Sequence, residues 1–275
     1  MSELPRDMSK ARMFKIAGWI AIIIAFAVSL SLTPLVGAIP LFIGYLLFRE
    51  GKKYSVKGGE TVMKADNRPP VVYLRSFNDE TEDRSLPKYF KSGSLSNDRD
   101  LARSVPPSGL REQDALGFVF RKVGPYIALG KPGEKLPELG SSKIYVPNES
   151  WQAEIRKYFG SSRLIIFRAG KTEGLKWELE QMVHMVNPRK VVMIVPATDE
   201  DYAGFIQWAN MILPARLPLD YPASRIIVFD EKWKPSYLKP GLTLTDSFSP
   251  FLRQNGISVK ETFWEKVLEH NGIRW

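Results

Sequence analysis

Residues 16–48 form an uninterrupted stretch of 33 residues without a charged side chain. About 20 apolar residues are enough to cross a bilayer as a helix, so one straight helix of this length would extend far beyond the hydrocarbon core. The segment SLSLTP at 29–34 interrupts the stretch near its middle, and proline disfavours the helical conformation in the residue before it. The pattern therefore predicts a transmembrane hairpin of two short helices, over 16–32 and 35–48.

Basic residues flank this stretch on both sides. Residues 1–57 contain eight Lys/Arg and three acidic residues, which supply five of the nine net positive charges of the chain. Because positively charged flanks stay on the cytoplasmic side, we expect a multi-pass protein of the inner cell membrane whose soluble domain is cytoplasmic. A cleaved signal peptide, one long tilted span, and a re-entrant or interfacial hairpin are the alternatives.

The rest of the chain excludes several classes of protein. The residues after position 57 carry only the remaining four net positive charges. They do not predict a nucleic-acid interface, which needs basic residues clustered on the folded part. The chain contains no Cys, which excludes disulfides and thiolate metal sites. Its two histidines, His184 and His270, lie far apart in the sequence, so we expect no metal site and no bound cofactor.

Short apolar segments alternate with amphipathic ones after the hairpin. We expect a basic N-terminus at 1–15, the hairpin at 16–48, a polar linker at 49–68 and an α/β domain at 69–275. Strands are predicted at 71–74, 125–129, 164–167, 191–195 and 226–229, with an extra one at 144–146, and helices at 110–123, 149–159, 202–213 and 261–270. This alternation predicts a five-stranded parallel sheet with helices on both faces. The polar insertion at 78–108 has no assigned role.

The segment RLIIFRAGKTEGLKWELEQM at 163–182 is expected to border the functional crevice. It predicts a buried strand, a loop with two glycines and an amphipathic helix, and ligands of parallel α/β sheets bind outside the carboxyl ends of the strands. At about 100° per residue, Glu178 falls near the edge of the apolar stripe, while Trp177 points roughly the opposite way, toward solvent. A carboxyl group at a core boundary is partly desolvated, which suits acid–base or nucleophilic chemistry. A solvated acid stabilised by the helix N-terminus is the alternative.

Two further segments are expected at the same edge of the sheet. The tripeptide RSF at 75–77 directly follows the first strand, and the loop GKPGEKLPELG at 130–140 follows the second. Three glycines and two prolines indicate a shaped loop, but the spacing is not that of a phosphate-binding P-loop. The candidate substrate-binding residues are Arg75, Ser76, Phe77, Lys131, Gly133 and Trp177.

These motifs resemble the TIR-like (Toll/interleukin-1 receptor-like) superfamily, of the bacterial membrane-anchored type. YLRSF at 73–77 is similar to the end of the first TIR strand, the 130–140 loop occupies the place of the BB loop, and the WEL triplet at 177–179 resembles the start of the third TIR helix. The resemblance covers residues 69–235 and implies a flavodoxin-like fold. Because the tryptophan and glutamate of the triplet are adjacent, a nucleoside deoxyribosyltransferase-like domain is an alternative.

The resemblance also implies a chemistry. In NAD-cleaving TIR domains the corresponding glutamate is catalytic, so Glu178 is the expected catalytic carboxylate for hydrolysis of the nicotinamide–ribose bond of NAD. Phe77 would stack on a base of this substrate, and Arg75 or Lys131 would pair with its pyrophosphate. The implied protein is a membrane-anchored signalling or defence protein that self-associates through the α/β domain. A non-catalytic interaction or nucleotide-sensing module is the main alternative.

Overall fold

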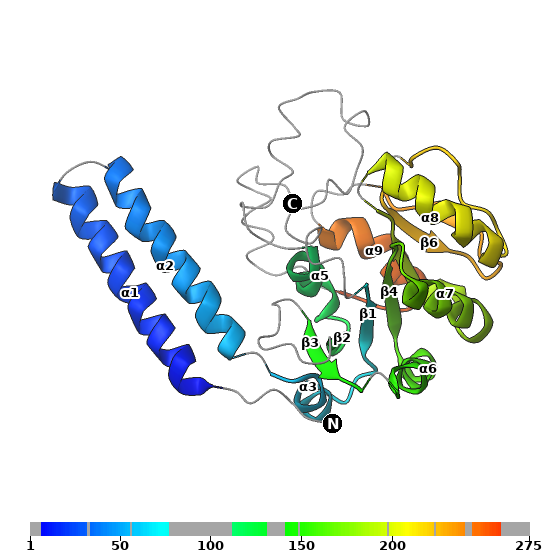
Figure 1. The fold of residues 1–275 in the computed structure, drawn as a ribbon, viewed down its shortest axis with the longest axis horizontal. Coiled ribbons are helices and arrows are strands. Elements are labelled where there is room, and N and C mark those ends of the chain that lie inside the picture. Colours follow the sequence, from blue (N-terminus) through cyan, green and yellow to red (C-terminus); the bar gives the residue numbers. More distant parts are fainter. Residues whose placement is uncertain are drawn as a thin grey trace.

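The protein has two parts, a helical hairpin and an α/β body (Figure 1). The computed structural model describes residues 7–31, 34–55, 57–76, 112–130, 141–147, 149–196, 198–222, 224–239 and 244–259. The insertion expected at 78–108, the loop after position 130 and the helix predicted at 261–270 lie outside the described residues.

The hairpin consists of two antiparallel helices, α1 (Met8–Ser31) and α2 (Pro34–Tyr54). The carboxylate of Asp7 accepts a hydrogen bond of 3.0 Å from the backbone N–H of Lys10, so it caps α1 well before the uncharged stretch begins. Pro34 occupies the first position of α2, where a helix needs no N–H donor. Both helices are present as predicted, and each extends further into the basic flank than its predicted bound.

Small residues set the register between the two helices. Three contacts pair Gly37 with Ala25, Gly44 with Gly18, and Gly51 with Ala11. In each contact, a β-carbon on the α2 glycine would lie 2.9–3.2 Å from the carbonyl oxygen of its partner. The contacts recur every seven residues on both helices, so the two backbones approach closely along the hairpin.

The outward surface of the hairpin is apolar. Trp19 and Phe26 on α1 are 60% and 69% exposed, and Phe42 on α2 is 61% exposed. Within the described residues, the segment Met8–Ser29 is the one helical segment long and apolar enough to cross a membrane, judged by length and composition. The apolar part of α2, Gly37–Phe48, is shorter. An exposed apolar surface of this extent marks a region that associates with lipid or with another protein.

We expect Gly44→Leu to separate α1 from α2, because the new side chain would overlap atoms of α1; overpacking of this kind costs about 1–3 kcal/mol. A cysteine pair at Phe14 and Tyr54, whose rings stack with centroids 5.6 Å apart, reports the contact in a chain that has no other Cys. A short bis-maleimide should cross-link the pair efficiently in the parent chain and poorly in the variant. The control is Ile43→Leu, at an outward position; equal cross-linking of both variants would contradict the register.

One seven-stranded mixed sheet, of order β3-β2-β1-β4-β5-β6-β7, forms the α/β body. The strands are β1 (Val71–Leu74), β2 (Tyr126–Gly130), β3 (Ser142–Tyr145), β4 (Leu164–Arg168), β5 (Val191–Ile194), β6 (Ile226–Phe229) and β7 (Pro235–Tyr237). The first five strands of this order are parallel, whereas β6 is antiparallel to β5 and β7 is antiparallel to β6. The α/β class is confirmed. The five-stranded parallel sheet is not, because β6 runs the other way, β3 is a full edge strand and β7 was not predicted.

The segment after α8 (Asp199–Ile212) explains the direction of β6. Residues 213–222 contain three prolines and form neither helix nor strand, and proline cannot donate to a sheet ladder. The Asn210 side chain bonds both backbone groups of Leu217, at 2.7 and 3.1 Å, and so holds the segment against α8. The Tyr221 hydroxyl then donates a hydrogen bond of 3.0 Å to the carbonyl oxygen of Pro196, just beyond β5. The chain has therefore returned to the carboxyl edge of the sheet, and β6 can only enter in the opposite direction.

Helices cover both faces of the sheet (Figure 1). One layer contains α3 (Gly59–Ala65), α6 (Trp151–Ser161), α7 (Glu173–Met185) and α8, and the other contains α5 (Glu112–Phe120) and α9 (Leu244–Gln254). A short 3-10 helix, Pro188–Lys190, leads into β5. This arrangement confirms the prediction of helices on both faces.

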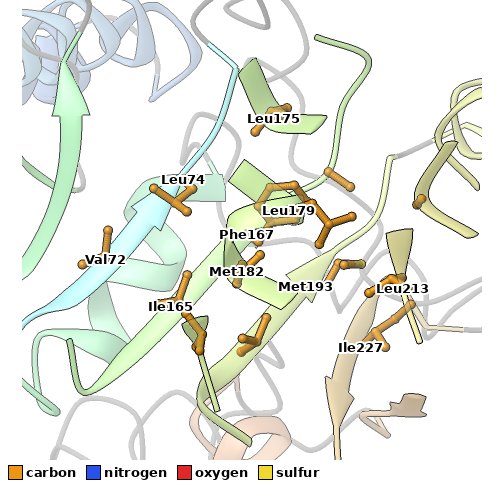
Figure 2. Packing of buried hydrophobic residues seen from close by; sticks show 14 of the residues in the cluster. Val72, Leu74, Ile165, Phe167, Leu175, Leu179, Met182, Met193, Leu213 and Ile227 are labelled. Atoms are coloured by element: carbon orange, nitrogen blue, oxygen red, sulfur yellow. The ribbon is translucent and has the colours of Figure 1, made fainter. Parts of the chain in front are cut away.

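Side chains of the central strands alternate between the two layers. Val72, Ile165 and Met193 pack on the α7 side (Figure 2), while their neighbours Val71 and Ile166 pack on the side of α5 and α9. Strands buried on both faces are apolar at nearly every position, which is why these segments were recognisable in the sequence.

The segment predicted as a polar linker, 49–68, is largely helical. Its first residues extend α2, and its middle forms α3, which packs against β3. Gly59 at the start of α3 lies so close to the Ile144 side chain that a β-carbon would overlap it. The chain between the hairpin and β1 is therefore docked on the edge of the sheet.

Candidate functional site

The strand order places the switch point of the fold between β1 and β4. From β1 the chain continues to β2 and β3 on one side, and then returns to β4 and β5 on the other. Open α/β sheets bind ligands outside the carboxyl ends of the strands at such a point. Leu74 of β1 pairs with Phe167 of β4, so the residues that follow this pair border the candidate site.

Helix α7 brings Glu178 to this edge of the sheet. Thr172 caps the helix, its hydroxyl accepting a hydrogen bond from the Leu175 backbone N–H at 3.5 Å. Glu178 shares the buried face of α7 with Leu175 and Leu179 and is 8% exposed. Figure 2 shows Leu179 beside Phe167 and Leu175 further toward the carboxyl edge. Glu178 thus lies near the end of β4, and its burial excludes the alternative of a solvated acid.

The Glu178 carboxyl group is shielded from water. Its Oε2 atom is buried and has no hydrogen-bond partner among the described residues. Burial penalises the charged form and raises the pKa of Glu178 to about 8. The carboxyl group is therefore mostly protonated at pH 7, and it can both donate and accept a hydrogen bond.

This pKa predicts a pH-dependent stability. The folded-state pKa of Glu178, about 8, lies above the ordinary value of 4.5. Between these values the folded state binds more protons than the unfolded state, so the free energy of unfolding should fall with rising pH by on the order of 1 kcal/mol per unit. Glu178→Gln should flatten this dependence and gain stability over the parent chain toward pH 8. Urea unfolding of the full chain in detergent at pH 5.5 and 8 measures the free energy of unfolding of both proteins. An equal change with pH in the parent and in Glu178→Gln would argue against a buried, neutral Glu178.

Two arginines lie at the same edge. Arg168, the last residue of β4, is 3% exposed. It lies two residues after Ile166 and therefore on the same face of the strand, the side of α5 and α9. Arg75 directly follows β1, and the pairing of the two strands places it beside Arg168. Guanidinium groups in a region of low dielectric bind anions strongly. The candidate site therefore has a carboxyl group on one side of the sheet edge and cationic groups on the other.

Arg75 is a predicted site residue, whereas Arg168 is not. The sequence pattern predicts that the strand ends at Phe167, so Arg168 falls in the predicted loop, but the strand includes it. Each arginine directly follows one residue of the Leu74–Phe167 pair, so the two arginines occupy equivalent positions on neighbouring strands. This equivalence is the sequence signal that points to Arg168. Ser76, the next predicted residue, is buried at the end of β1, with 4% of its surface exposed.

Trp177 does not point into solvent as predicted. It is half-buried between α7 and α6, where its ring meets the Trp151 ring edge-on with centroids 4.9 Å apart. The Arg156 guanidinium lies over the same ring, 5.2 Å from its centroid. The prediction was wrong because helical periodicity gives the direction of a side chain but not the neighbouring helix that covers it. Trp177 supports the packing of α6 on α7.

An ion pair positions the loop between β4 and α7. Lys171 in this loop contacts the Asp201 carboxylate at 2.5 Å, and Thr198 donates a hydrogen bond to the same carboxylate at 2.7 Å. Both interactions hold the pKa of Asp201 below its usual value. The start of α8 is thereby tied to the loop that precedes Glu178.

The remaining predicted site residues, Phe77, Lys131 and Gly133, lie outside the described residues. Within the described part of the chain, no group of three or more His, Cys, Asp or Glu side chains could hold a metal ion.

Comparisons of the chain with family models, with curated proteins and with solved structures find no match.

Proposed function

We propose that this protein is a membrane-anchored TIR-like signalling or defence protein whose flavodoxin-like body hydrolyses the nicotinamide–ribose bond of NAD. One observation carries the proposal: the Glu178 carboxyl group is buried on α7, the helix that follows β4, and β4 is one of the two strands at the switch point of the sheet. A buried polar group without a hydrogen-bond partner costs stability, and such groups with shifted pKa values cluster at functional sites. The order β2-β1-β4-β5 also agrees with the flavodoxin-like strand order.

The proposed reaction needs the ionised form of Glu178. The bond between ribose C1′ and the nicotinamide nitrogen breaks, and its electron pair leaves with nicotinamide. The carboxylate stabilises the positive charge that develops on the ribose. Water then adds to C1′, and the carboxylate accepts the proton that it releases. Ribose hydroxyls that donate hydrogen bonds to Glu178 favour its charged form and lower its pKa from the value set by burial.

Arg75 and Arg168 provide the contact for the diphosphate in this proposal. A guanidinium group binds phosphate oxygens through two parallel hydrogen bonds. The two arginines lie across the sheet edge from Glu178, which suits a long ligand with a ribose on one side and a diphosphate on the other. Phe77 and Lys131 remain candidates for contacts with the base and the diphosphate.

We expect the purified full chain to release nicotinamide from NAD. Glu178→Gln should lower the rate about 10²–10³-fold, the usual effect of removing one charge-stabilising group, whereas Glu180→Gln, a half-buried acid on the same helix, should leave it unchanged. The kcat/KM of the parent should rise with pH up to about 8, because it reports the pKa of the free enzyme. Chromatographic measurement of nicotinamide tests each of these expectations. No release, even when the chain is crowded on liposomes, would reject the hydrolase.

A non-catalytic module that binds a nucleotide or another copy of the domain is the second candidate. It is favoured by the raised pKa of Glu178, because a neutral carboxyl group recognises a ligand by hydrogen bonds but stabilises a developing positive charge poorly. In this case NAD should raise the Tm of the chain and be recovered intact.

We also propose that both helices of the hairpin enter the bilayer, with the α/β body on the cytoplasmic side. Support comes from the apolar outer surface of the hairpin and from its antiparallel register, which brings the two basic flanks to one end. Positive flanks stay in the cytoplasm.

Single cysteines test this topology in a chain that has none. Ser31→Cys lies at the closed end of the hairpin and Met8→Cys at the open end. In bacterial spheroplasts, a membrane-impermeant maleimide should label the first without lysis and the second only after lysis. Labelling of Met8→Cys in sealed spheroplasts would indicate the opposite orientation. Protection of both sites until lysis would indicate a re-entrant hairpin.

A further inference from the structure

The open end of the hairpin joins basic and aromatic side chains of both helices. The Lys10 ammonium of α1 lies over the Tyr54 ring of α2, 5.8 Å from its centroid. The Phe14 ring of α1 stacks on the same Tyr54 ring, with the two centroids 5.6 Å apart. Further along α1, the Trp19 ring meets the Phe48 ring edge-on at 5.7 Å. The first turns of α1 and the last turns of α2 therefore form one continuous surface, here termed the open-end surface.

This surface is strongly basic. Lys10, Arg12 and Lys15 are exposed on α1, and Lys57 is exposed just after α2. Arg49, Lys52 and Lys53 lie in the last turns of α2. Asp7 pairs with Lys10 at 3.2 Å, but Arg12 and Lys15 make no ion pair within the described residues. The positive charge is thus only partly neutralised by the protein.

We propose that the open-end surface binds the headgroups of anionic phospholipids. The proposal rests on the membrane hairpin proposed above and adds a lipid class to it. Four to eight basic residues beside a membrane segment attract anionic lipids, each strengthening the attraction about fivefold. Trp19, 60% exposed, and Tyr45, 44% exposed, lie on the membrane side of the basic residues, and such side chains prefer the headgroup level. The aromatic residues thereby hold the cations at the depth of the lipid phosphates.

The test measures the Tm of the purified full chain in dodecyl maltoside with added lipid. Phosphatidylglycerol should raise the Tm in a saturable and salt-sensitive way, whereas equal amounts of phosphatidylcholine should not. Soluble glycerol phosphate at the same charge concentration should also have no effect, which separates a lipid surface from a free phosphate site. A triple variant, Lys10→Gln, Arg12→Gln and Lys15→Gln, should lose at least half of the shift.

The matched control removes three exposed charges from the α/β body, through Lys157→Gln, Lys232→Gln and Arg253→Gln. It should keep the full shift, and both variants should have the parent Tm without lipid. An equal response to both lipids, or an unchanged response of the first triple variant, would overturn the proposal. Alkaline carbonate extraction tests the membrane hairpin separately: release of the chain rejects the hairpin, whereas retention without lipid preference rejects only the proposal made here.

Discussion

Burial of the central strands on both faces is the constraint on which the α/β body depends. Strands β1, β4 and β5 place alternate side chains in two apolar layers, and Figure 2 shows the layer on the α7 side. Parallel strands need helical crossovers, and these crossovers supply the covering layers. The same connections place every strand-to-helix loop of the parallel part at one edge of the sheet. The candidate site is therefore a consequence of how the core is covered.

Glu178 is an exception to this packing. It shares the buried face of α7 with apolar side chains, although an apolar residue there would avoid the desolvation of a carboxyl group. The penalty appears as a raised pKa and is reduced when the group stays protonated. A ligand with hydroxyl groups would relieve the same penalty, because it supplies the hydrogen bonds that Oε2 lacks among the described residues. Energetic cost and proposed function thus have one physical origin.

Glycines permit close packing both within the hairpin and at the edge of the sheet. Glycines of α2 bring its backbone against α1, and Gly59 of α3 brings the following segment against β3. In both places a side chain larger than hydrogen would overlap its neighbour. The basic end of the hairpin contains the end of α2, from which the chain leads to α3 and the sheet, as the proposed cytoplasmic placement requires.

The sequence by itself determined the local elements: the hairpin with its break at 29–34, the buried strands, and the boundary position of Glu178 on an amphipathic helix. Each follows from the spacing of apolar, polar and helix-breaking residues within a short segment. Only the tertiary structure decided the direction of β6, the place of Arg168 beside Arg75, and the burial of Trp177. These features depend on contacts between segments far apart in the chain, namely the return of the proline-containing segment along α8, the register of β1 with β4, and the packing of α6 on α7. Periodicity within one segment carries no information about which distant segment will lie against it.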